Sequence, residues 1–307
     1  MAAQLLDGKD LAQRIRVRLA EESAAFAARN GFPPGLAVVR VGDDPASAVY
    51  VRNKETAAAE VGFANYSVHL PAETSREDVL GKIRELGADR RVHGMLVQLP
   101  LPPHIDPWEA QIAVPPEKDA DGFHPENAGR LLLGRGDGLV SCTPRGVMAL
   151  LDDAKVELKG AEAVIVGRSN IVGKPLAHLL LGRHATVTVC HSRTRDLAEV
   201  CRRADVLVAA VGKPGLIRGS FVKQGATVID VGINEITDPR LAEDLLAGQP
   251  KRLERFAKNG RALVGDVHFG EALEVAGRLT PVPGGIGPLT VALLLENTLV
   301  AARRLCA

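Results

Sequence analysis

The most informative stretch of this chain is AVIVGRSNIVGKP, which runs from Ala163 to Pro175. Its apolar residues predict a short buried strand, Gly167 predicts a tight turn, and Gly173 opens the first turn of a helix. This geometry would direct a helix N-terminus and several free backbone N–H groups at one point, which attracts phosphate. By itself, the pattern G-R-S-x-x-x-G is less specific for a dinucleotide than a full G-x-G-x-x-G fingerprint.

The end of the next strand indicates which dinucleotide would bind. The predicted strand Thr186–Cys190 is followed by a His-Ser-Arg tripeptide at 191–193. In a dinucleotide-binding unit this strand end lies beside the adenosine ribose, where an acidic residue would hold the 2′-hydroxyl of NAD. Here Ser192 offers a hydroxyl group and Arg168 lies across the turn, and both suit a 2′-phosphate. The sequence therefore predicts NADP as the cofactor.

The bulk composition is that of an ordinary globular protein with room for two domains: 307 residues, of which 46% are apolar and 24% charged. A net charge of +1 gives no electrostatic reason to expect nucleic acid or an anionic membrane as a partner. The apolar run Val291–Ala302 is shorter than the ~20 residues that span a bilayer, and the charges near the N-terminus argue against a signal peptide. The cysteines show no paired short spacing, so they predict reduced thiols in a cytoplasmic protein: Cys142, Cys190, Cys201 and Cys306.

Strand and helix patterns alternate along most of the chain. In the first half we predict strands at Leu36–Val41, Ala64–Leu70 and Gly94–Leu99, and helices at Pro45–Val61 and Ser75–Leu86. Six prolines between residues 100 and 116 are expected to exclude regular structure. In the second half we predict strands at Ala163–Val166, Thr186–Cys190, Val206–Ala210 and Thr227–Val231, and helices at Gly173–Leu181, Asp196–Arg203 and Pro288–Arg304.

This alternation predicts an α/β protein with two parallel-sheet α/β domains flanking a cleft, the second of them of Rossmann type. The first domain would comprise residues 1–140 plus 286–307, because the final helix is expected to return and pack on it. The second would comprise residues 141–285. A basic segment at 238–261 is interpreted as one solvated helix inserted into the second domain.

Two features of the first half could carry chemistry. Tyr50 and Lys54 are four residues apart on one predicted helix, so they share a face. A lysine partly removed from water releases its proton more easily and can serve as a base or proton donor; a lysine that merely extends along the surface is the competing interpretation. Gln98 ends a predicted strand at the edge where ligands bind in parallel sheets, or it simply caps that strand.

Two further features are open to two interpretations. Asp119 and Asp121 follow the proline-rich segment. With no His or third carboxylate at ligand spacing, we expect no metal there. One carboxylate could accept two hydrogen bonds from an amidine-like heterocycle edge, or both could cap backbone groups in a turn. In the loop Pro281–Pro288, prolines restrict the backbone while glycines allow it to approach a ligand closely.

Taken together, these motifs resemble those of the bifunctional methylenetetrahydrofolate dehydrogenase / methenyltetrahydrofolate cyclohydrolase family. The resemblance covers essentially the whole chain, and several independent motifs occur in one order. They are Pro45-Ala46-Ser47 with Tyr50 and Lys54, Val97–Pro102, Pro116–Gly122, Cys142-Thr143-Pro144, Val166–Pro175 and Pro281–Thr290.

The resemblance implies NADP-dependent oxidation of 5,10-methylenetetrahydrofolate to 5,10-methenyltetrahydrofolate, followed by hydrolysis to 10-formyltetrahydrofolate in one-carbon metabolism. It implies tetrahydrofolate derivatives as substrates and a homodimer as the assembly. The domain at 1–140 plus 286–307 would then be the folate-binding catalytic domain, and the domain at 141–285 the NADP-binding one.

The resemblance also assigns roles to individual residues. Lys54, oriented by Tyr50 and Gln98, would be the catalytic group of the hydrolytic step. The substrate would be bound by Tyr50, Lys54, Gln98, Asp121, Pro283, Gly284 and Gly285. The cofactor would be bound by Gly167, Arg168, Ser169, Ile171, Gly173, Ser192 and Ile233, with Arg168 and Ser192 on the 2′-phosphate.

Two alternatives remain. One is an enzyme of the same fold that retains only the dehydrogenase, although hydride transfer alone has no clear use for Lys54 and Gln98. The other is a non-catalytic nucleotide-sensing module, which would bind a cofactor but would need no second ligand site.

Overall fold

The computed structural model describes residues 3–307, except for the side chain of Ala46. The chain divides into two compact units. The six-stranded unit consists of the chain up to Leu11 together with Thr143–Leu289, and the four-stranded unit consists of Ala12–Cys142 together with Thr290–Ala307. Each unit is an α/β domain built on a parallel sheet, as the sequence predicts.

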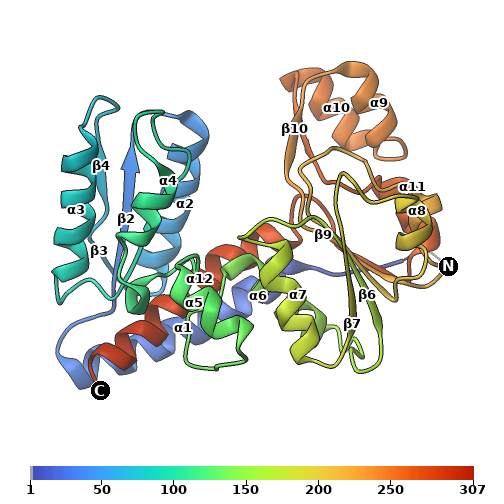
Figure 1. Cartoon of the computed structure of the whole chain (residues 1–307). Helices are drawn as coiled ribbons and strands as arrows, with labels where there is room; N and C mark the ends of the chain where they lie inside the picture. The colour runs from blue at the N-terminus through green and yellow to red at the C-terminus, as the bar shows by residue number, and fades with distance from the viewer. Residues whose placement is uncertain (1–2) are drawn as a thin grey trace. The chain divides into compact units, whose positions relative to one another are not determined.

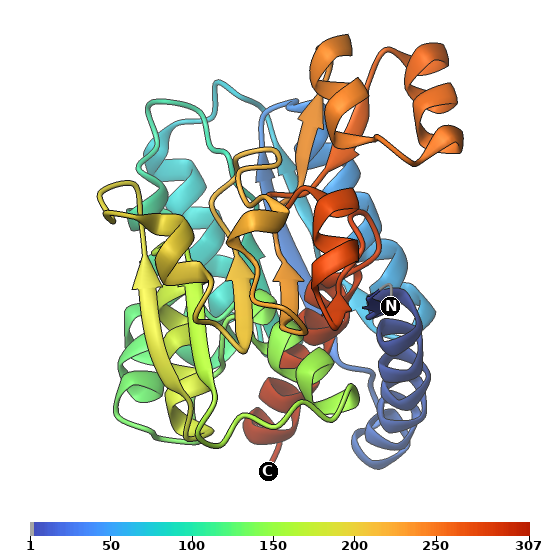
Figure 2. The ribbon, with the colours of Figure 1, turned by 90° about the vertical axis from the view of Figure 1, so that its right-hand side faces the viewer.

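The six-stranded sheet has the order β1-β12-β9-β8-β6-β7, and all its strands are parallel (Figure 2). Helices cover such a sheet on both faces, so its central strands are continuous apolar runs. Residues such as Val164, Leu207 and Val228 are fully buried in its core. The strands are β1 (Gln4–Leu5), β6 (Glu162–Val166), β7 (Thr186–Cys190), β8 (Val206–Ala209), β9 (Thr227–Asp230) and β12 (Arg278–Leu279).

The first residues of the chain depart from the expected boundary. We expected residues 1–140 in the unit that precedes the Rossmann-type domain. Instead, β1 pairs in parallel with β12, through Gln4 with Arg278 and Leu5 with Leu279. A strand of two residues is too short for a hydrophobic period to reveal it. The edge of the six-stranded sheet is therefore completed by the N-terminal segment.

Further helices and one antiparallel strand pair complete the region from Cys142 to Val275. Gly260 ends α10 in the left-handed conformation that favours glycine. These elements are α6 (Cys142–Asp153), α7 (Gly173–Gly182), α8 (Leu197–Cys201), η2 (Gly219–Phe221), β10 (Asn234–Ile236), α9 (Pro239–Leu245), α10 (Pro250–Asn259), β11 (Ala262–Val264) and α11 (Phe269–Val275).

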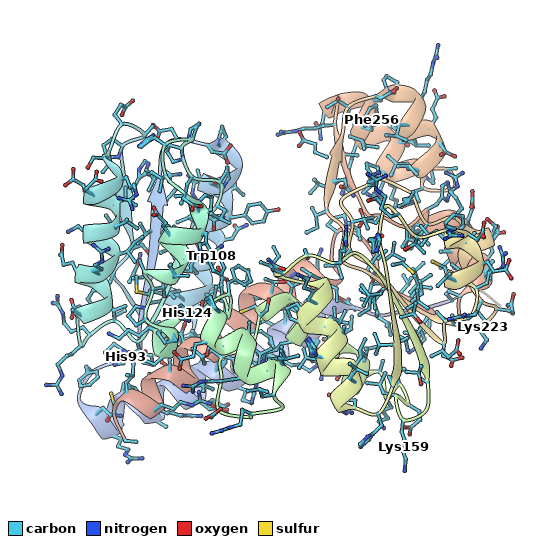
Figure 3. All side chains as sticks on the ribbon, viewed as in Figure 1. His93, Trp108, His124, Lys159, Lys223 and Phe256 are labelled. Atoms are coloured by element: carbon cyan, nitrogen blue, oxygen red, sulfur yellow. The ribbon has the colours of Figure 1, made fainter. Side chains whose placement is uncertain are left out.

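The segment at 238–261 is not the single solvated helix that we expected. It forms two helices, α9 and α10, beside the antiparallel β10–β11 pair. Phe256 (Figure 3), Leu245 and Val264 belong to a small buried cluster of their own. Pro250 cannot continue a preceding helix but suits the first turn of a new one, so the segment breaks there.

The four-stranded sheet is built around β2 (Gly35–Val41), which is almost entirely buried. β5 (Gly94–Val97) pairs with one side of β2, while β3 (Ala64–Asn65) and β4 (Val68–Leu70) pair with the other, all in parallel. The single strand that we expected over Ala64–Leu70 is therefore split. The hydroxyl of Ser67 accepts the N–H of Val38 at 3.1 Å, and this side-chain bond replaces a ladder bond.

The remaining helices include two, α1 and α12, that begin in the six-stranded unit and continue into the other (Figure 1). Ser75 caps α3: its hydroxyl accepts the N–H of Asp78 at 3.1 Å and donates to the Asp78 carboxylate at 2.8 Å. The helices are α1 (Gly8–Asn30), α2 (Pro45–Glu60), α3 (Arg76–Ala88), α4 (Pro107–Ile112), η1 (Pro116–Lys118), α5 (Pro125–Leu132) and α12 (Ile286–Leu305).

The proline-rich segment contains regular structure, contrary to our expectation. Asp106 caps α4 by accepting the N–H of Trp108 at 2.9 Å, and Pro107 occupies the first helical turn. Proline is compatible with that position because its missing N–H would have no partner inside the helix. The number of prolines therefore led us to overestimate how far regular structure is excluded from this segment.

α12 is also longer than predicted, since it begins at Ile286 rather than Pro288. By length and composition alone this helix could cross a membrane, but 61% of its apolar window is buried inside the protein. Burial of this extent is typical of a core helix. Its residues from Thr290 onward belong to the four-stranded unit, whereas we expected this segment to begin at residue 286.

Candidate functional site

The predicted catalytic residues lie at the carboxyl edge of the four-stranded sheet. The Nζ atom of Lys54 donates a hydrogen bond to the Oε1 atom of Gln98 at 3.1 Å. Lys54 is in the middle of α2, and Gln98 directly follows β5. Because the strands that succeed β2 lie on opposite sides of it, β2 and β5 flank a topological switch point, where ligands of open α/β sheets bind.

The local sequence orients both partners. Asp44 caps α2 by accepting the N–H of Ser47 at 2.7 Å, and the buried Ser47 hydroxyl donates to the carbonyl of Leu99 at 3.2 Å. The Gln98 amide nitrogen donates to the same carbonyl at 2.8 Å, which leaves its oxygen directed at Lys54. Ser47 thus ties α2 to the Gln98 loop, a role that our sequence analysis did not assign.

Lys54 is half-buried and engaged, rather than extended freely along the surface. Tyr50 precedes it by one helical turn and is 48% exposed, so much of its ring is open to a ligand. A half-buried ammonium group held by an amide oxygen is well placed to hold or donate a proton at a bound molecule.

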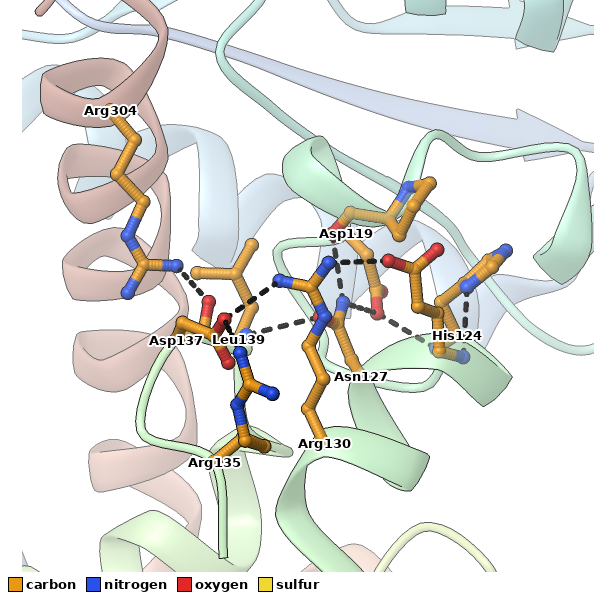
Figure 4. A network of polar contacts seen from close by, with 10 residues as sticks. Asp119, His124, Asn127, Arg130, Arg135, Asp137, Leu139 and Arg304 are labelled. Atoms are coloured by element: carbon orange, nitrogen blue, oxygen red, sulfur yellow. Dashed lines mark hydrogen bonds and ion pairs between the residues drawn. The ribbon is translucent and has the colours of Figure 1, made fainter. Parts of the chain in front are cut away.

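Asp119 and Asp121 differ in burial and in their contacts. The Asp119 side chain is buried and accepts the N–H groups of Gly122 at 3.1 Å and His124 at 2.7 Å, and the amide of Asn127 at 3.0 Å (Figure 4). Burial raises the pKa of Asp119, and the hydrogen bonds from His124 and Asn127 oppose the shift. Asp119 is therefore a turn-capping residue. Asp121 is half-buried and remains the candidate for ligand binding.

A second set of contacts supports the turn that carries Asp121. The buried Asn297 of α12 donates to the carbonyls of Ala120 and Val140, both at 2.9 Å. Cys142 donates its N–H to the carbonyl of Asp121 at 3.3 Å. Sequence analysis missed Asn297, although a polar residue that interrupts an apolar helix is a signal that could have found it.

Groups of three or more His, Cys, Asp or Glu side chains able to hold a metal are absent from residues 3–307. The four cysteines are free thiols, three of them buried. Burial raises the pKa of Cys201 to about 12, so this thiol is protonated at neutral pH.

The predicted dinucleotide residues gather in the six-stranded unit. Gly167 follows β6 with a φ of +134°, and a Cβ atom on it would lie 2.2 Å from the carbonyl oxygen of Ala210. A Cβ atom on Gly173 would lie 2.1 Å from the carbonyl oxygen of Gly167. Glycine is thus required at both positions of the turn. β6 and β8 flank the switch point of this sheet, so the turn fits a dinucleotide cradle.

The helix N-terminus at this turn differs from our expectation in one respect. The Ser169 hydroxyl accepts the N–H of Val172 at 3.1 Å and of Gly173 at 3.4 Å, and the Ser169 carbonyl accepts the N–H of Lys174 at 3.1 Å. These N–H groups are therefore bound within the turn rather than free. The positive end of α7 still faces the same region, but a larger share of anion recognition falls to side chains.

The side chains predicted to meet the cofactor are accessible. Arg168, Ser169, Ile171 and Ser192 are exposed. Ser192 lies in a turn after β7 in which the Nδ1 atom of His191 accepts the N–H of Arg193 at 3.1 Å. Ile233 is 44% exposed and follows β9 at the same edge of the sheet. The arrangement fits NADP, with Arg168 and Ser192 available to a 2′-phosphate.

The Pro283–Gly285 segment also lies in the six-stranded unit, together with the dinucleotide residues. Gly284 has a φ of +115°, and a Cβ atom on Gly8 would lie 1.7 Å from the Gly285 carbonyl oxygen. Pro283 is exposed, whereas Gly284 and Gly285 are buried. The loop is therefore packed against the start of α1, which holds its shape.

Comparison with known proteins agrees with this geometry. Residues 6–121 match the catalytic domain of the tetrahydrofolate dehydrogenase/cyclohydrolase family, and residues 141–306 match the NAD(P)-binding domain of that family. The chain is 53% identical over 304 residues to the bifunctional protein FolD of Moorella thermoacetica, covering 99% of this chain and all of that protein.

Solved structures agree as well. The bifunctional FolD enzyme of Campylobacter jejuni superposes with a TM-score of 0.89 at 43% identity, over 99% of both chains. The Trypanosoma brucei FolD, solved with NADP and an inhibitor, also gives 0.89, at 42% identity over 99% of this chain and 98% of that one. The chain therefore belongs to the tetrahydrofolate dehydrogenase/cyclohydrolase family.

Proposed function

We propose that Lys54, held by Gln98, carries the hydrolytic step of an NADP-dependent methylenetetrahydrofolate dehydrogenase and methenyltetrahydrofolate cyclohydrolase. Family membership gives the two reactions. The observation that supports the residue assignment is the 3.1 Å contact between Lys54 Nζ and Gln98 Oε1 at the carboxyl edge of β5. Hydride transfer alone has no use for such a pair.

The oxidation of 5,10-methylenetetrahydrofolate demands mainly positioning. NADP, when bound, accepts a hydride from the methylene carbon, while the folate nitrogen lone pairs stabilise the resulting cation. The protein has to hold the two reactants at near-attack distance. We assign this role to the turn from Gly167 to Gly173, with Ile233, for the cofactor, and to the Pro283–Gly285 loop for the substrate at the nicotinamide end.

The hydrolysis of the methenyl product demands proton transfer. Water attacks the cationic carbon and loses a proton, which gives a neutral hydroxyl adduct. When the carbon–nitrogen bond then breaks, the leaving nitrogen gains a proton and the hydroxyl loses its own to become the formyl oxygen, so one proton is released overall. Lys54 lies where its amine can relay a proton between the water and the leaving nitrogen. Tyr50, exposed one turn away, would border the folate, and Asp121 would accept hydrogen bonds from its pterin edge.

The remaining assignments extend from the family rather than from single contacts. The four-stranded unit would bind folate and the six-stranded unit would bind NADP, in a cytoplasmic homodimer that needs neither nucleic acid nor a membrane. The net charge of +1 is consistent with this choice of partners. Light scattering at working concentrations tests the dimer, and a monomeric mass would overturn it.

The decisive variant is Lys54→Met, which removes the ammonium group but keeps the aliphatic side chain. Cyclohydrolase activity should fall by roughly 10²- to 10⁴-fold, the usual contribution of a general acid–base group. Cofactor binding and much of the dehydrogenase activity should remain. Reduced nicotinamide and the methenyl chromophore are followed separately, so the variant should accumulate the methenyl product.

Lys82→Met is the matched control, because Lys82 lies on α3 of the same unit and pairs with Glu85. It should leave both activities unchanged. Equal loss of both activities in Lys54→Met would mean that Lys54 positions the substrate instead of relaying a proton. A wild-type protein that accumulates methenyl product would indicate a dehydrogenase alone, and one that reduces neither NADP nor NAD would favour the nucleotide-sensing module.

A further inference from the structure

Two buried carboxylates lie beneath the carboxyl edge of the six-stranded sheet, and the proposed chemistry uses neither. Asp230 ends β9, and Asp266 follows β11 by two residues. Asp266 is fully buried and Asp230 is 4% exposed. The Asp230 carboxylate accepts the N–H groups of Gly232 at 3.0 Å and of Asp266 and Val267, both at 2.9 Å. Asp230 thus holds the main chain on which Asp266 is placed.

The Asp266 side chain in turn gathers four donors. One of its oxygens accepts the N–H groups of Val211 at 2.6 Å and Gly212 at 3.0 Å. The other accepts the N–H of Lys213 at 2.8 Å and the side-chain amide of Asn234 at 2.9 Å. Hydrogen bonds to an ionised acceptor are short and about twice as strong as neutral ones. A single carboxylate therefore fixes three successive backbone groups.

These groups lie at the proposed dinucleotide crevice. The turn at 211–213 follows β8 and Ala210, whose carbonyl oxygen approaches Gly167 so closely that a Cβ atom there would lie 2.2 Å away. Asn234 follows Ile233 after β9. Asp266 thus connects the carboxyl ends of β8 and β9 beside the phosphate-binding turn of β6. Gly232 leaves room for it, because a Cβ atom on Gly232 would lie 2.4 Å from the Asp266 carboxyl carbon.

We propose that Asp266 is a positioning residue of the dehydrogenase, which fixes the turn at 211–213 and Asn234 at the crevice and thereby sets the affinity for NADP. This inference rests on the proposed function of the six-stranded unit. Among the described residues, Asp266 is the acceptor for the N–H groups of this turn. The turn is otherwise held by the packing of Val211 on the core and by the Lys213 carbonyl, which accepts the N–H of Leu216 at 3.3 Å. The Asp266 main chain, by contrast, is also held by the N–H of Ile217 at 2.9 Å. Changing the side chain should therefore loosen the turn and leave the supporting segment in place.

Asp266→Asn is the sharpest test, because the residue keeps its shape while one acceptor oxygen becomes an NH₂ group facing N–H donors. The KM for NADP should rise roughly 10- to 100-fold, since at least one hydrogen bond to a charged acceptor is lost. The kcat at saturating NADP should stay within about 3-fold of the wild type. Hydrolysis of methenyltetrahydrofolate without NADP should be unchanged, because Lys54 and Gln98, to which we assign the proton transfer, lie in the other unit.

Asn234→Ala is a second, milder variant, which removes one donor from a half-buried position and should raise the KM for NADP by about 3- to 10-fold. It decides the matter if Asp266→Asn does not fold. Asp205→Asn is the matched control. Asp205 precedes β8 at the opposite end of the strand, where it accepts the N–H of Glu162 at 2.9 Å and pairs with Lys223 at 2.7 Å. The KM of the Asp205→Asn variant for NADP should equal that of the wild type.

An unchanged KM for NADP in both test variants, or an equal loss of dehydrogenase and cyclohydrolase activity, would overturn the inference and make Asp266 a purely structural residue. The proposed function fails in a different way. In that case the wild-type protein itself shows no NADP-dependent oxidation, whatever the behaviour of the variants.

Discussion

At the scale of single residues, identical side chains two positions apart lie in different environments. Asp119 is buried and fully engaged by backbone and amide donors, whereas Asp121 is half-buried beside it. The difference arises because the chain turns at Gly122, whose φ is +71° and whose Cβ position would collide with the main chain of Val140. The capping of the turn by Asp119 therefore determines where Asp121 is presented.

This difference predicts opposite outcomes for two alanine substitutions. Asp119→Ala leaves the N–H groups of Gly122 and His124 and the amide of Asn127 without their acceptor, which should cost about 2–4 kcal/mol in the free energy of unfolding. Asp121→Ala should change stability little but weaken the binding of a folate analogue. Chemical denaturation and a thermal-shift titration measure the two effects. Equal stability of the two variants would contradict the assignment.

At the scale of elements, the turn between β6 and α7 shows how a helix N-terminus can be partly self-capped. Ser169 binds the N–H groups of Val172 and Gly173, so these donors are already satisfied before any ligand arrives. The helix dipole remains, but it stabilises a bound anion less than direct hydrogen bonds from free N–H groups would. Discrimination between NADP and NAD should therefore depend strongly on Arg168, which is exposed beside the turn.

Arg168→Ala tests this dependence. Loss of a guanidinium group that pairs with a 2′-phosphate should raise the KM for NADP by roughly 10- to 100-fold and leave that for NAD nearly unchanged. Initial rates with each cofactor measure the ratio. Arg202→Ala, which removes an arginine that donates to the Ser220 carbonyl elsewhere in the same unit, is the control. An equal rise in the KM for NADP and for NAD would mean that Arg168 binds another part of the dinucleotide.

At the scale of the whole molecule, the buried acidic pair gives stability a distinctive dependence on pH. Burial raises the pKa of Asp230 from 3.8 to about 7, and the nearby Asp266 carboxylate contributes to the rise. The folded protein then keeps a proton that the unfolded chain has already released. The stabilisation from this proton is complete below the ordinary value and is lost as the pH rises through about 7.

Asp230→Asn should remove this titration. Between about pH 5 and pH 7 the free energy of unfolding of the wild type should fall, relative to the variant, by up to about 1.4 kcal/mol per pH unit, the effect of one proton. Denaturation at several pH values measures the two slopes. Asp205→Asn should keep the wild-type slope, since Lys223 lowers the pKa of Asp205 and its titration lies at more acidic pH. Parallel slopes for wild type and Asp230→Asn would refute the titration.

The sequence by itself determined the α/β class, the parallel direction of the main strands and the family. The strands at Thr186–Cys190 and around Val166 were predicted closely, because buried parallel strands are continuous apolar runs. Helical spacing from Tyr50 and the position at a strand end made Lys54 and Gln98 candidates, each with a competing interpretation. Their catalytic role was implied by the family resemblance, and the structure adds the 3.1 Å contact between them.

The tertiary structure alone decided the features that depend on contacts distant in sequence. β1 pairs with β12 across more than 270 positions of chain, Asn297 supports the Asp121 turn from α12, and Asp266 gathers the turn at 211–213. None of these contacts produces a hydrophobic periodicity in the local sequence. A two-residue strand or a single buried polar side chain is defined by its partners and not by its neighbours in sequence. Those partners are brought together only when the sheets form.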